Sequence, residues 1–265
     1  VTANPAMAHM LGYDSPEQFA RDVVEPAWRE YEENFWKDQS AYVEVWLEKQ
    51  SLASVFAPIC QRHNVRLEAT RGDWSDSKIF EAADRLRFKI ADGKDVRVLY
   101  FGDYNPSGLH APVAVQNTMR HYGLDIRRGL RESDYNEERF YFDIWPFNSP
   151  LEDNDSGGSI AFERAALNTE HIEKYDLPEN PTPSSTDKDR DLRERFQRLV
   201  SGRDVNVELN ALKEYHRDDL EQMLEDAIKQ HIDGSKRGGA ERREQQARNA
   251  LREAINVDYS ALNDD

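Results

Sequence analysis

The sequence predicts an α/β protein in which a parallel, doubly wound sheet is flanked by helices. Apolar runs alternate with longer segments of helical periodicity between residues 42 and 121. Gly and Pro turns or polar capping residues separate these segments. A strand–helix alternation of this length forms βαβ units with right-handed crossovers. The chain also carries 5 Trp, 11 Tyr and 11 Phe in 265 residues, which supply the large apolar groups of a sizeable core.

The regular part of the chain is preceded by an N-terminal helical segment, residues 1–41. Its helix begins at Ser15-Pro16-Glu17, with Ser as the cap and Pro in the first turn. Strand–helix units then follow one another. The predicted strands are 42–47, 65–69 and 96–101, and the predicted helices are 49–62, 76–91 and 107–121.

The α/β core is expected to span residues 42–150 and to end with a strand at 139–145, which Pro146 terminates. Residues 151–191 are rich in Pro, Gly and small polar residues and are predicted to be loop and linker. A helical C-terminal extension, residues 192–265, follows. Its predicted helices are 209–232 and 240–255, with a break at Gly234.

Charge, cysteine content and hydropathy restrict the partners and the cellular compartment that we expect for the protein. The net charge of −16 argues against binding nucleic acid by bulk charge, although local cation clusters escape that argument. A salt-adapted acidic surface and an ordinary acidic cytoplasmic protein both fit this charge. A single cysteine, Cys60, excludes an internal disulfide and fits a reducing cytoplasm. No apolar run has the length of a membrane span, so no membrane partner is expected, and the opening Val is that of a fragment or processed chain.

Two predicted strands end in a carboxylate. The strand at 42–47 runs into Glu48, and the strand at 96–101 leads through Gly102 to Asp103 in a Pro/Gly turn. Carboxyl ends of neighbouring parallel strands lie side by side, so we expect the two acids to converge. Converging carboxylates repel unless a cation lies between them, and Mg2+ prefers such oxygen ligands. The sequence therefore predicts a magnesium site, with Mn2+ as a substitute.

These segments resemble the Toprim pattern of topoisomerases, bacterial primases and related nucleases, in which one strand ends in Glu and another in Asp-x-Asp. They are most similar to the branch of the topoisomerase VI A subunit and its meiotic double-strand-break relatives, especially the small phage and mobile-element versions. The stretches that carry the resemblance are 44–49, 71–72, 102–108, 166–170, 177–178 and 207–212, within roughly residues 40–235.

The resemblance implies a Toprim (Rossmann-like) fold, a homodimer, and Mg2+-dependent action on DNA through strand cleavage or a change of topology. The enzyme would be topoisomerase-like or nuclease-like. The implied catalytic and metal-binding residues are Glu48, Asp103 and Asn105. The candidate DNA- or phosphate-binding residues are Lys49, Arg71, Gly72, Ser107, Arg127 and Arg128. Arg127 and Arg128 are included because clustered cations can follow a phosphate backbone.

The chain departs from the family pattern in two ways. Asn105 stands where the pattern has a second metal-binding aspartate, and an amide oxygen brings no charge to a cation. Only 41 residues precede the first strand, too few for the winged-helix domain that carries the nucleophilic tyrosine of the relatives. Cleavage would then use a metal-activated water, or a tyrosine from missing sequence or a partner. Tyr104 is a weak substitute because turn aromatics normally pack or lie on the surface.

Plainer interpretations remain open. The whole chain fits a catalytically retired Toprim module that binds DNA or a protein partner, with Asn105 as the sign of retirement. Ser107 either caps the following helix or presents amides to a phosphate. Glu208 either adds a ligand or lies at a helix start, where the helix dipole favours an acid. Glu44 lies about 13 Å behind the sheet edge, and we expect it to pair with an arginine.

Overall fold

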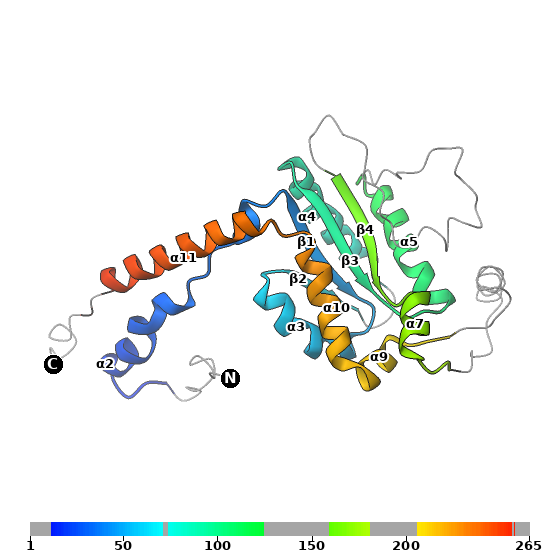
Figure 1. Cartoon of the computed structure of the whole chain (residues 1–265). Helices are drawn as coiled ribbons and strands as arrows, with labels where there is room; N and C mark the ends of the chain where they lie inside the picture. Colours follow the sequence, from blue (N-terminus) through cyan, green and yellow to red (C-terminus); the bar gives the residue numbers. More distant parts are fainter. Residues whose placement is uncertain (1–11, 71–73, 125–158, 181–205, 256, 258–265) are drawn as a thin grey trace. The chain divides into compact units, whose positions relative to one another are not determined.

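The computed structural model describes residues 12–70, 74–124, 159–180, 206–255 and 257 (Figure 1). The chain divides into two compact units. The core unit comprises residues 39–232, and the helical unit comprises residues 1–38 together with 233–265. The strand predicted at 139–145 lies outside the described residues.

The core unit is built on a four-stranded sheet of order β2-β1-β3-β4, and all neighbouring strands are parallel. The strands are β1 (Ala41–Leu47), β2 (Arg66–Ala69), β3 (Asp95–Phe101) and β4 (Ser159–Ala166). A parallel α/β sheet is therefore confirmed, and it is compatible with a Rossmann-like fold. The first three strands agree with the predicted ranges to within one residue.

The fourth strand, β4, and the helix α7 (Thr169–Tyr175) lie in the stretch predicted to be loop and linker. That part of the prediction was wrong. The strand was missed because it contains Glu163 and Arg164, which interrupt the apolar pattern of a buried strand. Both side chains are nevertheless buried, because each finds polar partners inside the fold: Glu163 bonds His231, and Arg164 bonds backbone carbonyls.

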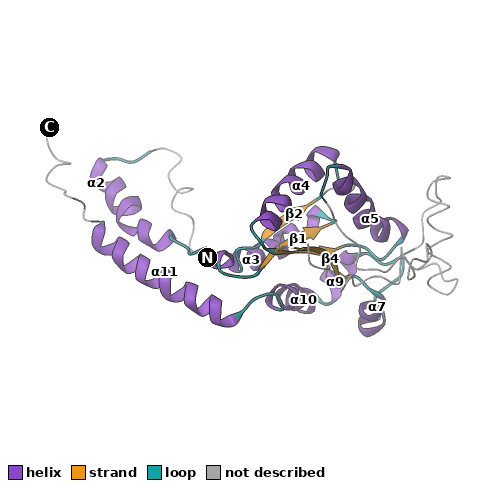
Figure 2. Ribbon diagram, turned by 90° about the horizontal axis from the view of Figure 1, so that it is seen from above, coloured by secondary structure: helices purple, strands orange, loops and turns teal. Residues whose placement is uncertain are grey.

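Helices cover both faces of the sheet (Figure 2). α4 (Asp76–Ala91) packs against β3 and α5 (Pro106–His121) on one face. α3 (Ala53–Arg62) packs against β2 and against α10 (Arg217–Lys229), which also contacts β4. The helix predicted at 49–62 begins with a short 3-10 turn, η4 (Gln50–Leu52), before α3.

The core lies between the sheet and the α4–α5 pair. Trp46 on β1 pairs in register with Tyr100 on β3, and Phe162 on β4 pairs with Val98 on β3; all four side chains are buried there. Trp74 stacks on Trp46 with ring centroids 4.2 Å apart. On the opposite face Phe56 of α3 meets Phe101 edge to face at 4.9 Å. Because both faces bury large side chains, the strand ends are held in a fixed position.

The C-terminal helices differ from the prediction. The expected helix 209–232 is divided at His216 into α9 (Leu209–Tyr215) and α10, because His216 leaves the helical conformation with φ −144°. Gly234 does not break a helix but begins α11 (Gly234–Ala254). Asp233 caps that helix by accepting hydrogen bonds from the amides of Ser235 and Lys236.

The helical unit pairs the N-terminal segment with α11. Ser15 caps α2 (Pro16–Phe19), as predicted from the sequence, and the segment continues through η1 (Ala20–Val24), η2 (Glu25–Glu30) and η3 (Phe35–Lys37). Arg243 of α11 bonds Glu33 and Asp38, and Arg248 donates to the carbonyl of Tyr31. The arginines of α11 thus hold this unit together through polar contacts.

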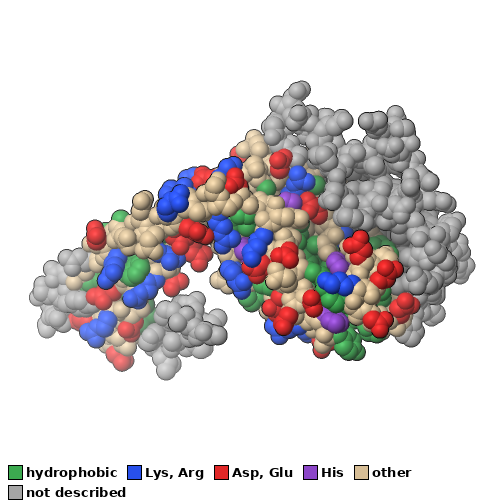
Figure 3. Space-filling model, in the orientation of Figure 1, with side chains coloured by type: hydrophobic (Ala, Val, Ile, Leu, Met, Phe, Trp, Pro, Cys, Tyr) green, Lys and Arg blue, Asp and Glu red, His purple; other side chains and the backbone are tan. Residues whose placement is uncertain are grey.

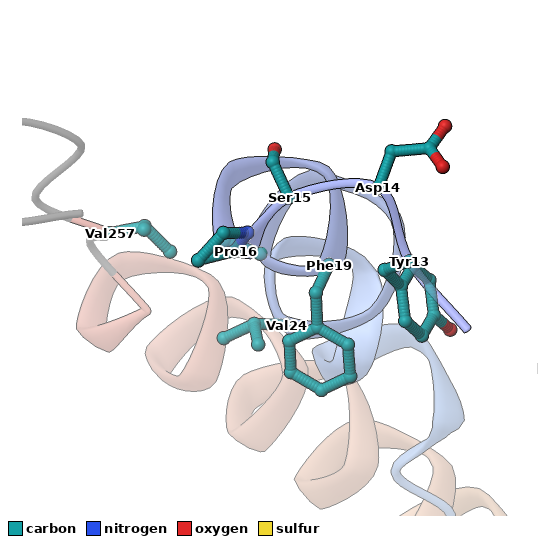
Figure 4. A pocket seen from close by; sticks show the side chains of 8 residues that line it. Tyr13, Asp14, Ser15, Pro16, Phe19, Val24 and Val257 are labelled. Carbon is teal, nitrogen blue, oxygen red and sulfur yellow. The ribbon is translucent and has the colours of Figure 1, made fainter. Parts of the chain in front are cut away.

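A shallow, mainly apolar hollow of about 620 Å³ lies in the helical unit (Figure 4). Residues from the start of the unit line it, with Val257 from the other end of the chain. Tyr13 and Phe19 meet edge to face in its wall, with ring centroids 5.0 Å apart. Phe19 remains 42% exposed in this wall.

A buried ion pair joins β1 to α4, as expected for Glu44. The Glu44 carboxylate is fully buried, and both of its oxygens accept hydrogen bonds from Arg85, at 2.8 and 3.0 Å. Tyr42 and Trp46 donate to the same carboxylate at 2.9 and 3.0 Å. A buried charge satisfied in this way depends on its partner, because the ionised carboxylate would otherwise lose its hydration without replacement.

We predict that Arg85→Leu lowers the free energy of unfolding by about 3 kcal/mol, because it leaves the Glu44 carboxylate buried and uncompensated. Urea unfolding followed by circular dichroism measures the change. The control is Arg217→Leu, which removes an exposed pair with Glu221 and should cost less than about 1 kcal/mol. Equal losses in the two variants would contradict this assignment.

Candidate functional site

The candidate site lies where the chain changes direction across the sheet. After β1 the chain adds β2 on one side, and it then returns to add β3 on the other side of β1. The segments that follow β1 and β3 therefore part from one another at the carboxyl ends of these two strands. Ligands of open α/β sheets bind at such a switch point. Glu48 directly follows β1 here, and Asp103 follows β3 after one residue.

The structure brings Glu48 and Asp103 together, as the sequence predicts. The Oε2 atom of Glu48 accepts a hydrogen bond from the backbone N–H of Asp103 at 2.8 Å. The same oxygen accepts from the hydroxyl of Tyr100 at 3.1 Å. The backbone N–H of Glu48 in turn donates to the carbonyl of Phe101 at 3.0 Å, so the two strand ends are joined in both directions.

Two glycines make room for the Glu48 carboxylate. A Cβ atom on Gly102 would lie 2.4 Å from Oε2 of Glu48, and one on Gly108 would lie 3.1 Å from it. The same atom on Gly108 would also come within 2.4 Å of the carbonyl oxygen of Asp103. Distances this short exclude any side chain at Gly102 and Gly108 without rearrangement. The glycines of the turn therefore form a cradle for the carboxylate.

Asp103 is buried, and both of its carboxylate oxygens are engaged. Oδ1 accepts from the backbone N–H of Leu209 at 2.8 Å, and Oδ2 lies 2.9 Å from the Nζ atom of Lys49. Lys49 also contacts Glu208, at 2.8 Å. A short antiparallel bridge between Tyr104 and Val207 carries Glu208 and Leu209 to this edge of the sheet. One ammonium group thus lies between carboxylates from two distant segments.

Asn105 takes a structural role in this arrangement. Its Oδ1 atom accepts from the backbone N–H of Gly108 at 2.7 Å, which caps the start of α5. Its Nδ2 atom donates to Asn206 at 3.3 Å. The expectation that Ser107 caps this helix was wrong, because Asn105 makes that bond. Ser107 itself lies exposed in the first turn of the helix.

Arg164 is the site residue that sequence reasoning missed. Its side chain comes from β4, is only 3% exposed, and donates to the carbonyls of Gly102, Asp103, Gly108 and Leu167. It also lies over the ring of Tyr100, 5.6 Å from the centroid. Its only signal in the sequence was its position two residues before the family-like stretch 166–170, and without a predicted strand this position did not indicate the site.

Burial and charge act together on the ionisable groups. Burial, and then the charge of Asp103, raise the pKa of Glu48 above its ordinary value. Burial lowers the pKa of Arg164 and also opposes ionisation of the Lys49 ammonium. Hydrogen bonds from Lys49 to Glu208 and Asp103 outweigh that effect, so the pKa of Lys49 is raised on balance. The site therefore holds a carboxyl group whose ionisation is disfavoured, Glu48, beside an amine whose protonated form is favoured, Lys49.

Four of the residues predicted to bind DNA or phosphate have no described position. Arg71, Gly72, Arg127 and Arg128 lie outside the described residues. The hydroxyl of Tyr104 lies 2.8 Å from that of Thr169, at the start of α7.

Oxygen donors gather at this edge of the sheet, but a divalent cation needs several of them around one point. Within the described ranges, no three Asp, Glu, His or Cys side chains lie together ready to hold a metal ion. The Lys49 ammonium, however, stands between Asp103 and Glu208 as a monovalent cation would. The side chains are hard oxygen donors of the kind that Mg2+ takes. A divalent cation held by these side chains would therefore have to displace Lys49 from Asp103.

Comparison of the whole chain with family models, with curated proteins and with solved structures finds no match. Among the described helices, none combines the length and the apolar composition that a membrane span requires.

We predict that Glu48→Gln raises the free energy of unfolding at neutral pH in buffer that contains a chelator. Because the pKa of Glu48 is raised in the folded state, ionisation of this group costs stability as pH rises through that pKa. The gain from Gln should therefore shrink as pH falls, and it should vanish below the ordinary carboxyl pKa of about 4.3.

Urea unfolding at a series of pH values measures this difference. Glu221→Gln is the matched control because Glu221 lies on the exposed side of α10, paired with Arg217. The control should show no comparable pH-dependent gain. A Glu48→Gln variant that is less stable than the parent at every pH would contradict the assignment.

Proposed function

We propose that the core unit is a divalent-cation-dependent, DNA-acting module of the Toprim type, related to the topoisomerase VI A branch. The observation that carries the proposal is the convergence of Glu48 and Asp103 at the switch point of the sheet. There the Glu48 carboxylate accepts a hydrogen bond of 2.8 Å from the backbone N–H of Asp103. The motif resemblance supplies the substrate class. The reaction would be phosphodiester cleavage, alone or as part of a change in DNA topology.

Mg2+ would be held by Glu48 and Asp103, with the amide oxygen of Asn105 as a weaker ligand and Glu208 close by. When bound, the cation would stabilise negative charge on the reacting phosphoryl group and activate a water. The chain's own residues prepare that position: the glycine cradle fixes the Glu48 carboxylate, and Arg164 fixes the turn that carries Asp103. A tyrosine supplied by a partner domain is the alternative nucleophile that the resemblance implies.

The charge on the rest of the surface supports the proposal that DNA binding depends on the cation. On the face shown in Figure 3, Lys and Arg side chains of described residues are interspersed with Asp and Glu side chains. With a net charge of −16, DNA would be repelled at a distance. A bound cation that bridges protein carboxylates and phosphate oxygens would supply the local attraction that the overall charge does not.

The second candidate is a retired module that binds DNA or a protein without cleaving. Two observations favour it: Asn105 uses its oxygen to cap α5, and Lys49 neutralises Asp103 with no metal needed. A divalent cation would have to replace the second interaction. The two candidates therefore differ in whether purified protein binds Mg2+ and whether DNA is cut.

We predict that the protein nicks supercoiled plasmid in the presence of Mg2+ or Mn2+ but not of chelator. Glu48→Gln and Asp103→Asn should each lower the nicking rate about a hundredfold, because each removes a charged ligand of the cation that would stabilise the reacting phosphate. Gel electrophoresis of the plasmid over time measures the rate. Glu221→Gln, the control on α10, should retain the parent rate.

Asn105→Asp is the informative companion variant. A carboxylate at this position still accepts the hydrogen bond of the Gly108 amide and adds one negative charge, so a gain in nicking would identify a weakened enzyme. Parent protein and Asn105→Asp that both fail to nick, with no heat of Mn2+ binding in calorimetry, would establish the retired module instead.

A further inference from the structure

We infer that Lys49 is a built-in counter-cation that gates the proposed divalent site: its ammonium occupies the space between Asp103 and Glu208 until a divalent ion displaces it. This inference rests on the proposed function and adds a means of regulation to it. It concerns the chain's own lysine, and its test measures cation binding and the chemical reactivity of that lysine.

The position of Lys49 makes its ammonium a competitor of a divalent cation for the same carboxylate oxygens. Its Nζ atom lies 2.9 Å from Oδ2 of Asp103 and 2.8 Å from Oε2 of Glu208, within contact distance of both carboxylates. Oδ1 of Asp103 is already held by the N–H of Leu209. The oxygen that Lys49 covers is therefore the one that a cation would need, and the two positive charges exclude each other there.

The surroundings also let the ammonium leave. The Lys49 side chain is 23% exposed, and that of Glu208 is 41% exposed, so the outer half of the contact borders solvent. A lysine side chain is flexible and rotates about four bonds. Asp103, by contrast, is buried and fixed by backbone. Exchange of the cation then requires motion of Lys49 alone, without any rearrangement of the sheet edge.

Displacement would give the site a second property. While Lys49 neutralises Asp103, its charge is not available to a phosphate. When a divalent ion takes over that carboxylate, the ammonium is released beside the same edge and can contact a phosphate oxygen. Binding of the cation and binding of a phosphodiester would then reinforce each other, which is a coupling between two ligands through one side chain.

The test compares Mn2+ affinity of the parent protein with that of Lys49→Met and Lys49→Arg by titration calorimetry and by electron paramagnetic resonance of free Mn2+. Lys49→Met removes the competing charge and should bind Mn2+ at least tenfold more tightly. Lys49→Arg keeps the charge and should bind no more tightly than the parent. Circular dichroism and thermal unfolding verify that each variant is folded.

A second measurement follows Lys49 itself. The rate at which an acetylating reagent modifies the Lys49 amine, measured by mass spectrometry of the folded parent protein, should rise at least threefold when Mn2+ is added. Lys229 serves as the internal control because it pairs with Glu225 at 2.8 Å on the surface of α10, outside the site. Its rate of modification should not change.

Each outcome decides something. Equal Mn2+ affinity in the parent and Lys49→Met, or weaker binding in Lys49→Met, overturns the gate and leaves the divalent site in place. Absence of Mn2+ binding in the parent and in both variants overturns the gate and the proposed function together. Tighter binding by Lys49→Met with an unchanged acetylation rate in the parent also overturns the gate, because the ammonium would then not move.

Discussion

The rest of the site depends on the hydrogen bonds of the Arg164 guanidinium. It donates to backbone carbonyls at the end of β3, at the start of α5 and just beyond β4. These segments are distant in sequence, and their carbonyls would otherwise point at one another inside the protein. A buried cation satisfies several of them at once, at the cost of its own desolvation. The turn that carries Asp103 therefore has one defined shape.

That shape places negative charge where a protein normally avoids it. Glu48 lies in a cradle that two glycines leave open, and its carboxylate points at the backbone amide of Asp103. Burial and the charge of Asp103 disfavour ionisation of Glu48. Such a group is held against its own preference by the surrounding packing, which is typical of sites where charge is used for binding or chemistry. The ammonium of Lys49 offsets part of the negative charge of Asp103 and Glu208, and no such contact reaches the Glu48 carboxylate among the described residues.

The same charge balance connects the two candidate functions. With Lys49 on Asp103 the site is internally neutralised, as a retired module would be. With Lys49 displaced, the same carboxylate oxygens would be free to bind the cation that the proposed Mg2+-dependent function requires. The position of one flexible side chain thus separates the two interpretations.

The sequence by itself determined the first three strands, the helices between them and the meeting of Glu48 with Asp103. Strands buried on both faces give continuous apolar runs, and the carboxyl ends of parallel strands share one edge. Only the tertiary structure decided that β4 exists, that Asn105 caps α5 and that Lys49 bonds Glu208. Charged side chains hide a buried strand until their partners are known, and those partners come from segments that only folding brings together.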